Sequence, residues 1–231
     1  MALLLLSNSA SADGYLVHAL DWMAETLDGA RHVSFVPYAA VTISFDAYAD
    51  RVREALAPLD VRVTSVHEAE SAAAVIASSD AVLVGGGNTF HLLRLLYRHG
   101  LIDAVRKAVR GGTPFVGWSA GSNVAGPTIC TTNDMPIVEP PSFEALGLVP
   151  FQINPHYTDA HPPGHRGETR AERLAEFVAC HATPVVALPE GTALRVDDGA
   201  VTHLGDAPAH LFTRDTPAGR PLTDAELATL I

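Results

Sequence analysis

The sequence contains few cysteines and few basic side chains. Its 2 cysteines, Cys130 and Cys180, form neither a Cys-x-x-Cys motif nor a set dense enough for a disulfide framework. Lys and Arg number 15 against 26 Asp and Glu, so the formal net charge is −11, and no basic run appears. A nucleic-acid surface would normally concentrate Lys and Arg. We therefore expect reduced thiols and no nucleic-acid partner.

Long apolar runs are also missing. No stretch approaches the roughly 20 apolar residues of a membrane span. Residues 1–12 combine an apolar run with small residues, as a signal peptide does. They lack a positively charged start, and their apolar run is shorter than the roughly 7–15 residues that such a peptide needs. We expect a first buried strand here, a cytoplasmic location and no membrane partner.

What the chain does contain is a regular alternation of short apolar runs and amphipathic segments. With 231 residues and 48% hydrophobic content it can bury one sizeable core, and we predict one domain over residues 1–231. The alternation predicts an α/β fold with a mostly parallel sheet covered on both faces. Strands are expected at Ala2–Leu6, Val33–Val36, Val61–Val66, Ala81–Val84, Phe115–Gly117 and Val185–Leu188, and helices at Tyr15–Leu27, Phe45–Leu56, Ala69–Ala77, Phe90–Arg98, Ile102–Val109 and Thr169–Cys180.

Two segments depart from this alternation. Residues 131–167 are rich in Pro, Asn, Asp and His and form a connection too long to be minimal, which favours a functional role. Near the C-terminus, Leu194–Val196 and Val201–Leu204 flank residues 197–200, which have the composition of a hairpin loop. We expect an antiparallel hairpin there.

The most informative motif is Gly-x-Ser-x-Gly at residues 117–121, which directly follows an apolar strand. It is typical of a nucleophile elbow, in which a strained strand-to-helix turn exposes the serine and needs small neighbours in order to close. Ser119 is then the candidate nucleophile, and the N–H of Ala120 would point at the developing oxyanion. The same motif also occurs by chance in glycine-containing loops, so the residues elsewhere in the chain must decide whether Ser119 is catalytic.

A second glycine-rich segment, Gly85-Gly86-Gly87-Asn88-Thr89, follows the strand predicted at Ala81–Val84. Its unobstructed N–H groups can form an anion-binding nest, and Gly86 or Gly87 could supply the second oxyanion donor. A phosphate loop is the competing interpretation. The following Phe90-His91 replaces the Gly-Lys-Ser/Thr of a Walker motif, and no GxGxxG spacing fits.

A serine nucleophile needs a base, and that base needs a carboxylate to orient it. Among 11 histidines, His156 follows an apolar segment within the long polar loop, and it is our candidate base. Glu190, directly after the last apolar strand, and Asp134, beyond the nucleophile, compete as the orienting acid. Residue patterns alone do not choose between them, and either acid could instead cap a turn.

The histidines at 156, 161 and 165 also suggest a zinc site, because spaced histidines in a loop can converge on a metal. No His-x3–5-His helix motif or clear carboxylate partner accompanies them, and Pro162-Pro163-Gly164 indicates a rigid solvated loop. We expect neither a metal nor a cofactor.

Taken together, these motifs resemble the peptidase E, or aspartyl dipeptidase, family of serine peptidases. Seven blocks match in order: Leu3–Ser9, Val84–Phe90, Gly117–Gly121, Thr131–Val138, Gln152–His156, Gly164–His165 with Gly167–Arg170, and Leu188–Gly191. The resemblance implies a three-layer αβα fold like that of class I glutamine amidotransferases (flavodoxin-like), with serine in place of their cysteine. It also implies hydrolysis of dipeptides that begin with aspartate.

The resemblance assigns roles residue by residue. Ser119 would be the nucleophile, His156 the base and Glu190 the third member, with Asp134 as the alternative. Arg170 would recognise the aspartyl carboxylate, and we also expect Asn88 to contact the substrate. An arginine can bind a carboxylate through two parallel N–H bonds, which suits an acidic protein with a short acidic peptide as its partner.

Several alternatives stay open. Arg170 could form a helix-surface ion pair with Glu168, Glu172 or Glu176. The protein could cleave isoaspartyl, cyanophycin-type peptides, bind a ligand without turnover, or be a zinc hydrolase. The sequence leaves a monomer and a homodimer equally open.

Overall fold

The computed structural model describes residues 1–160, 164 and 166–231. Within that part of the chain, seven strands form the central sheet in the order β11-β10-β1-β7-β6-β4-β5. Their bounds are β1 Leu3–Leu6, β4 His32–Val36, β5 Arg62–Ser65, β6 Ala81–Val84, β7 Phe115–Trp118, β10 Ala193–Asp197 and β11 Ala200–Leu204. The five strands β1, β7, β6, β4 and β5 run parallel, and β10 and β11 extend the sheet beside β1 as an antiparallel hairpin.

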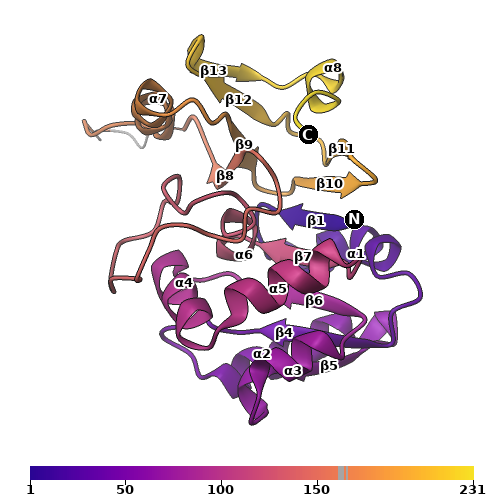
Figure 1. Ribbon diagram of the computed structural model, residues 1–231. Helices are drawn as coiled ribbons and strands as arrows, with labels where there is room; N and C mark the ends of the chain where they lie inside the picture. The colour runs from indigo at the N-terminus through magenta and orange to yellow at the C-terminus, as the bar shows by residue number, and fades with distance from the viewer. Residues whose placement is uncertain (161–163, 165) are drawn as a thin grey trace.

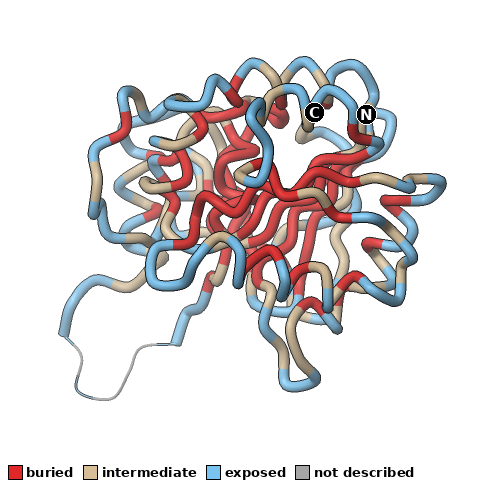
Figure 2. Tube along the Cα trace, turned by 90° about the horizontal axis from the view of Figure 1, so that it is seen from below, coloured by how far each residue is buried: buried red, intermediate tan, exposed pale blue. Residues whose placement is uncertain are grey.

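Helices cover both faces of this sheet and make three layers. One face packs against α1 (Leu20–Thr26) and α2 (Phe45–Leu56), and the other packs against α3 (Ala72–Ala77), α4 (Thr89–Arg98) and α5 (Leu101–Arg110). The strands are therefore apolar on both sides, and all four leucines of β1 are completely buried. Figure 2 shows the buried strands at the centre and exposed segments around them.

A second sheet lies beyond β1 and the hairpin (Figure 1). Its strands follow the order β13-β12-β9-β8, with bounds β8 Gln152–Tyr157, β9 Val185–Pro189, β12 His210–Thr213 and β13 Thr216–Pro221. The helix α7 (Arg170–Cys180) packs on it through Leu174 and Val178. Shorter elements complete the described chain: β2 Ala10–Ser11, β3 Gly14–Tyr15, η1 Val17–Ala19, η2 Ala57–Leu59, η3 Val66–Glu68, α6 Ala120–Asn123 and α8 Asp224–Leu227.

The α/β class, the six predicted strands and the C-terminal hairpin are confirmed. The order of the parallel strands is 3-2-4-5-1 when they are numbered along the chain, whereas the flavodoxin order is 2-1-3-4-5. The first strand therefore lies beside β7, next to the hairpin. One helix also starts later than predicted: residues 14–15 pair as β3, and Leu16 has a φ of 62°, so α1 begins only at Leu20.

The long polar loop predicted over residues 131–167 contains an element that we did not expect. Residues 152–157 form β8, the edge strand of the second sheet, and His156 belongs to this strand. This strand was not predicted because it contains Pro155, and proline within an apolar run argues against a strand except at sheet edges and bulges. No helix in the described part of the chain is long and apolar enough to cross a membrane, and both cysteines are free thiols.

Candidate active site

Ser119 lies on a sharp turn between β7 and α6. Its φ of 53° and ψ of −116° lie outside the ordinary regions for a residue with a side chain, and such backbone strain is concentrated at functional sites. A Cβ at position 117 would come within 2.6 Å of the Gly121 main chain, and one at position 121 within 2.0 Å of the Val84 oxygen. Gly117 therefore allows β7 and α6 to approach each other closely, and Gly121 allows α6 to approach the end of β6, so that the turn can present the serine as the motif predicts.

His156 faces Ser119 through one ring nitrogen and Glu190 through the other. The Ser119 Oγ to His156 Nε2 distance is 2.9 Å, and the His156 Nδ1 to Glu190 Oε1 distance is 3.0 Å. With Nδ1–H donating to the carboxylate, Nε2 is the acceptor for the serine hydroxyl. The histidine side chain is 35% exposed and the glutamate side chain 68% exposed. The arrangement can move a proton from the serine to the imidazole.

The position of His156 depends on a local break in β8. The residue has a φ of 55°, and the pairing of β8 with β9 shifts register between Asn154 and Tyr157. Its N–H donates to the Oγ of Ser7 at 2.9 Å, and that hydroxyl donates to the carbonyl of Leu188 at 2.8 Å. Ser7 is completely buried. It ties the bulge to β9, the strand that ends just before Glu190.

Ser7 was not among the predicted site residues, although it is the first residue after β1. Residues that follow parallel strands collect at the ligand-binding edge of a sheet. That placement was the signal that could have found it.

Three main-chain N–H groups near Ser119 are available for an oxyanion. A Cβ at position 86 would lie 2.9 Å from the Ser119 Cβ, so the main chain of Gly86 passes directly beside Ser119. Among the described residues, the N–H groups of Gly86, Gly87 and Ala120 donate to no protein acceptor, whereas those of Gly85 and Asn88 do. Gly87 has a φ of 138°, a conformation that favours glycine.

Asp134 does not contact the imidazole. Its Oδ2 accepts hydrogen bonds from the N–H of Thr89 at 2.7 Å, the hydroxyl of Thr89 at 2.6 Å and the hydroxyl of Thr132 at 3.3 Å. Of the two acids that the sequence left open, the one within hydrogen-bond distance of His156 is Glu190. The Asp134 carboxylate instead lies beside Thr89, the first residue of α4, where the helix dipole favours a negative charge.

Arg170, the first residue of α7, points toward the site. Its Nη1 donates to the carbonyls of His156 at 2.5 Å and Pro155 at 3.4 Å. Burial lowers the pKa of the guanidinium, as does the nearby Arg173, while the carboxylates of Glu190 and Asp134 raise it. An arginine in this setting stays positively charged at neutral pH.

The surface ion pair considered for Arg170 is replaced by these contacts to main-chain carbonyls. Glu168 lies 3.7 Å from Arg173 instead. Asn88, expected to contact the substrate, caps α4 through His91 N–H at 3.0 Å and donates to the Met135 carbonyl at 2.9 Å. Both of its polar side-chain atoms are therefore engaged in the fold.

Two cavities meet at Ser119 and His156. The smaller, of about 200 Å³, is lined by Arg170, Asp134 and Ala120, together with Thr89, Thr132, Asn133 and Pro155. The larger, of about 630 Å³, extends past Gly86 and Gly87 toward α2 and β3. A substrate bond placed at Ser119 therefore has room on both sides.

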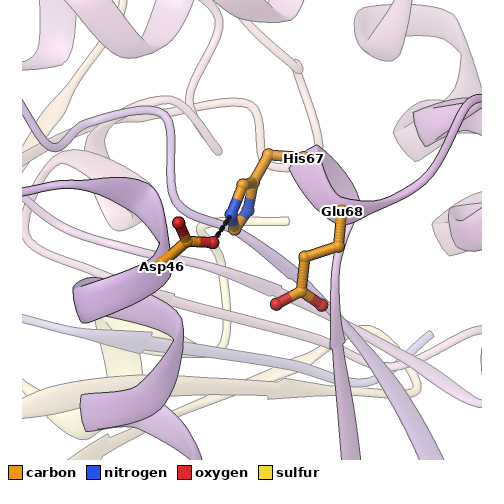
Figure 3. A group of neighbouring side chains, drawn as sticks. All are labelled: Asp46, His67 and Glu68. Atoms are coloured by element: carbon orange, nitrogen blue, oxygen red, sulfur yellow. Dashed lines mark hydrogen bonds and ion pairs between the residues drawn. The ribbon is translucent and has the colours of Figure 1, made fainter.

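A separate group of Asp46, His67 and Glu68 has the composition of a metal site (Figure 3). Its members are already paired: His67 Nε2 lies 3.0 Å from Asp46 Oδ1, and Glu68 accepts from Arg53 at 2.7 Å. A cation would have to displace that guanidinium. We interpret the group as a polar connection between α2 and η3. Of the histidines in the zinc alternative, His161 and His165 lie outside the described residues.

Comparison with known proteins gives a consistent result. The model of peptidase family S51 matches residues 3–204. Peptidase E of Shewanella amazonensis is 47% identical over 231 residues, covering 100% of this chain and 98% of that protein. Peptidase E of Streptomyces coelicolor is 51% identical over 233 residues, covering 100% and 95%. The crystal structure of a peptidase from an acI-B1 Actinobacterium has the same fold, with a TM-score of 0.69 at 15% identity and 96% of each chain covered.

Proposed function

The chain belongs to peptidase family S51, and from that premise we propose that it hydrolyses dipeptides with N-terminal aspartate through a covalent aspartyl-enzyme. The observation that carries the proposal is the pairing of charges in the smaller cavity. Arg170 and Asp134 line one space of about 200 Å³ together with Ser119. An N-terminal aspartyl residue has one carboxylate and one ammonium group close together, which this cation and this anion complement.

In the proposed reaction, Ser119 Oγ attacks the peptide carbonyl while His156 Nε2 takes its proton. Glu190, at 3.0 Å from Nδ1, stabilises the imidazolium that forms. The N–H of Ala120 and that of Gly86 or Gly87 hold the oxyanion. The C–N bond then breaks, and the imidazolium gives its proton to the leaving amine. A water molecule, deprotonated by the same imidazole, attacks the ester carbonyl. The bond to Ser119 Oγ breaks, the imidazolium returns its proton to that oxygen, and aspartate is released.

The cavity also supports rejection of neutral analogues. Arg170 already donates to two carbonyls from Nη1, and among the described residues its remaining N–H groups have no acceptor and can bind a carboxylate. An asparaginyl residue would leave this half-buried charge without an anion, which costs free energy. We therefore propose that the aspartyl carboxylate docks on Arg170 and the α-ammonium on Asp134.

We further propose that the reaction uses neither metal nor cofactor and takes place in the cytoplasm, without a nucleic-acid or membrane partner. Both ring nitrogens of His156 are engaged, one by Ser119 and one by Glu190, so zinc could bind this imidazole only by displacing one of these partners. Two exposed free thiols suit a reducing compartment. Full activity after exhaustive chelation is expected, and loss of activity that zinc restores would contradict the metal-free mechanism.

The experiment that tests the function is a panel of purified dipeptides. We expect kcat/KM to be highest for Asp-Leu and at least about tenfold lower for Asn-Leu and Glu-Leu, given the value of charged hydrogen bonds. Preference for isoAsp-Leu would instead assign the isoaspartyl activity. A sulfonyl-fluoride probe should label Ser119, and Asp-Leu should block the labelling. Absence of both turnover and labelling would leave a ligand-binding module of the same fold.

A further inference from the structure

The proposed binding of the aspartyl residue leaves the larger cavity beside Ser119 unfilled. We propose that it is the leaving-group subsite, in which Arg51 binds the free C-terminal carboxylate of the dipeptide and an apolar rim receives the side chain of the second residue. This inference rests on the proposed function, because it requires the aspartyl residue to occupy the smaller cavity. It would make the protein selective for dipeptides with a free C-terminus.

Charge is the first argument. When the N-terminal residue fills the smaller cavity, the second residue must extend into the remaining space of about 630 Å³. In a dipeptide that second residue carries a free carboxylate. Among the described residues that line this space, Arg51 is the one with a permanent charge, and its charge is positive. In a protein with a net charge of −11, an isolated cation at this place is a notable departure from the surrounding potential.

Arg51 is held in position by an aromatic ring, and its charge is not neutralised by an acidic partner among the described residues. Its guanidinium carbon lies 4.1 Å from the centroid of the Tyr15 ring. Within the described ranges no carboxylate pairs with Arg51, whereas Arg53 on the same helix contacts both Asp50 and Glu68. A stacked arginine without an acidic partner keeps its N–H groups available for an incoming anion.

A network of aromatic side chains connects this arginine to the reaction centre. The hydroxyl of Tyr15 lies 3.3 Å from that of Tyr48, which donates to the Gly86 carbonyl at 3.0 Å. Trp118, the residue before the nucleophile, donates its Nε1–H to the same Tyr48 oxygen at 3.0 Å. The anion site is thereby fixed relative to the loop that holds the oxyanion donors.

The larger cavity also has an apolar rim that can receive the side chain of the second residue. Val41, Ile43 and Ile137 line the same cavity and are 50%, 46% and 50% exposed. Large apolar side chains left in water beside a charged group provide a surface for an aliphatic residue, whose burial is favourable. The chemistry therefore fits a leaving amino acid with an apolar side chain and a free carboxylate.

The test compares Asp-Leu with Asp-Leu amide, which differ only in the C-terminal charge. Wild-type protein should show kcat/KM about tenfold higher for the acid, as expected for a charged hydrogen bond at a partly solvated site. In Arg51→Met this ratio should fall to about 1, and Arg51→Lys should restore part of it. Raising the salt concentration should lower the wild-type ratio. Arg62→Met, an exposed arginine at the start of β5, is the matched control.

Each other outcome has a distinct meaning. Equal rates with acid and amide in the wild type would overturn the Arg51 assignment and leave the proposed function standing. The Arg51 assignment is also overturned, and the proposed function again stands, if Arg51→Met lowers kcat/KM for the acid and for the amide by the same factor. If Arg170→Met, rather than Arg51→Met, abolishes the preference for the acid, the two cavities have exchanged roles and the inference is wrong. If the wild type cleaves no Asp-X substrate, the proposed function fails, and this inference fails with it.

Discussion

The two cavities that meet at Ser119 differ in how they hold charge. The smaller one sets a half-buried Arg170 against Asp134, so both signs are fixed by surrounding main chain and hydroxyls. The larger one has a single exposed arginine stacked on Tyr15 and an apolar rim. A charge in partly desolvated surroundings distinguishes a charged substrate group from a neutral one more strongly than an exposed charge does. We infer strict selection of the first substrate residue and tolerant selection of the second.

Removing the nucleophile should abolish this contrast entirely, because both cavities serve the same hydroxyl. Ser119→Ala should lose about three orders of magnitude or more in kcat with every substrate. The protein should stay folded, as measured by its melting temperature. Ser78→Ala, at the exposed end of α3, is a control that should keep full activity. Comparable Asp-Leu hydrolysis by the Ser119 variant would end the nucleophile assignment.

Neutralising the smaller cavity should remove its selectivity. Arg170→Met should lower kcat/KM for Asp-Leu by about 100-fold, the upper end for a charged hydrogen bond, and should change Asn-Leu much less. Arg173→Met, on the same helix but paired with Glu168, is the control. If the ratio of Asp-Leu to Asn-Leu stays at its wild-type value in Arg170→Met, the carboxylate is bound elsewhere.

Changing the acid behind the histidine tests the chemistry while keeping the charged side chains that line the two cavities, Arg170, Asp134 and Arg51. Glu190→Gln should lower kcat roughly tenfold with little change in KM, because it weakens stabilisation of the imidazolium. The effect is moderate because the Glu190 side chain is 68% exposed, so water can supply part of the stabilisation that the carboxylate gives to the imidazolium. Glu176→Gln, exposed on α7, is the control. A kcat equal to that of wild type would remove Glu190 from the mechanism.

Asp134→Asn should give the smallest change and the opposite kinetic signature. We expect KM for Asp-Leu to rise about fivefold at nearly constant kcat, the size of a weak charge pair with the substrate ammonium. Asparagine keeps an acceptor for the N–H of Thr89, so the melting temperature should change little. A large fall in kcat at constant KM would mean that Asp134, and not Glu190, supports the histidine during turnover.

The sequence predicts the parts of the fold and site that depend on local patterns. Apolar runs bounded by turn residues place the six predicted strands, and the spacing of Gly117, Ser119 and Gly121 indicates the strained turn before any coordinates are seen. The amphipathic segment at Phe45–Leu56 matches α2 at both ends. These features are encoded within a few residues of one another.

Features that depend on distant segments were missed. The strand β8 contains a proline and, in the described part of the chain, pairs with β9 alone, so its pattern did not stand out from the loop before it. The contact of Ser7 with His156 joins residues 149 positions apart. Residue patterns also left Glu190 and Asp134 open as the neighbour of His156. That choice depends on the pairing of β8 with β9, which places Glu190 beside His156 and which composition and spacing do not encode.

The left-handed main chain at Ser119 and His156 has a consequence for the evolution of the protein. Both positions have φ near 55°, which glycine adopts freely and other residues adopt at a cost of roughly 1–3 kcal/mol. Selection for thermal robustness alone would move each of them toward glycine. Because the hydroxyl and the imidazole at these two places are the groups to which we assign the chemistry, a heat-resistant variant obtained without screening for activity should often be inactive.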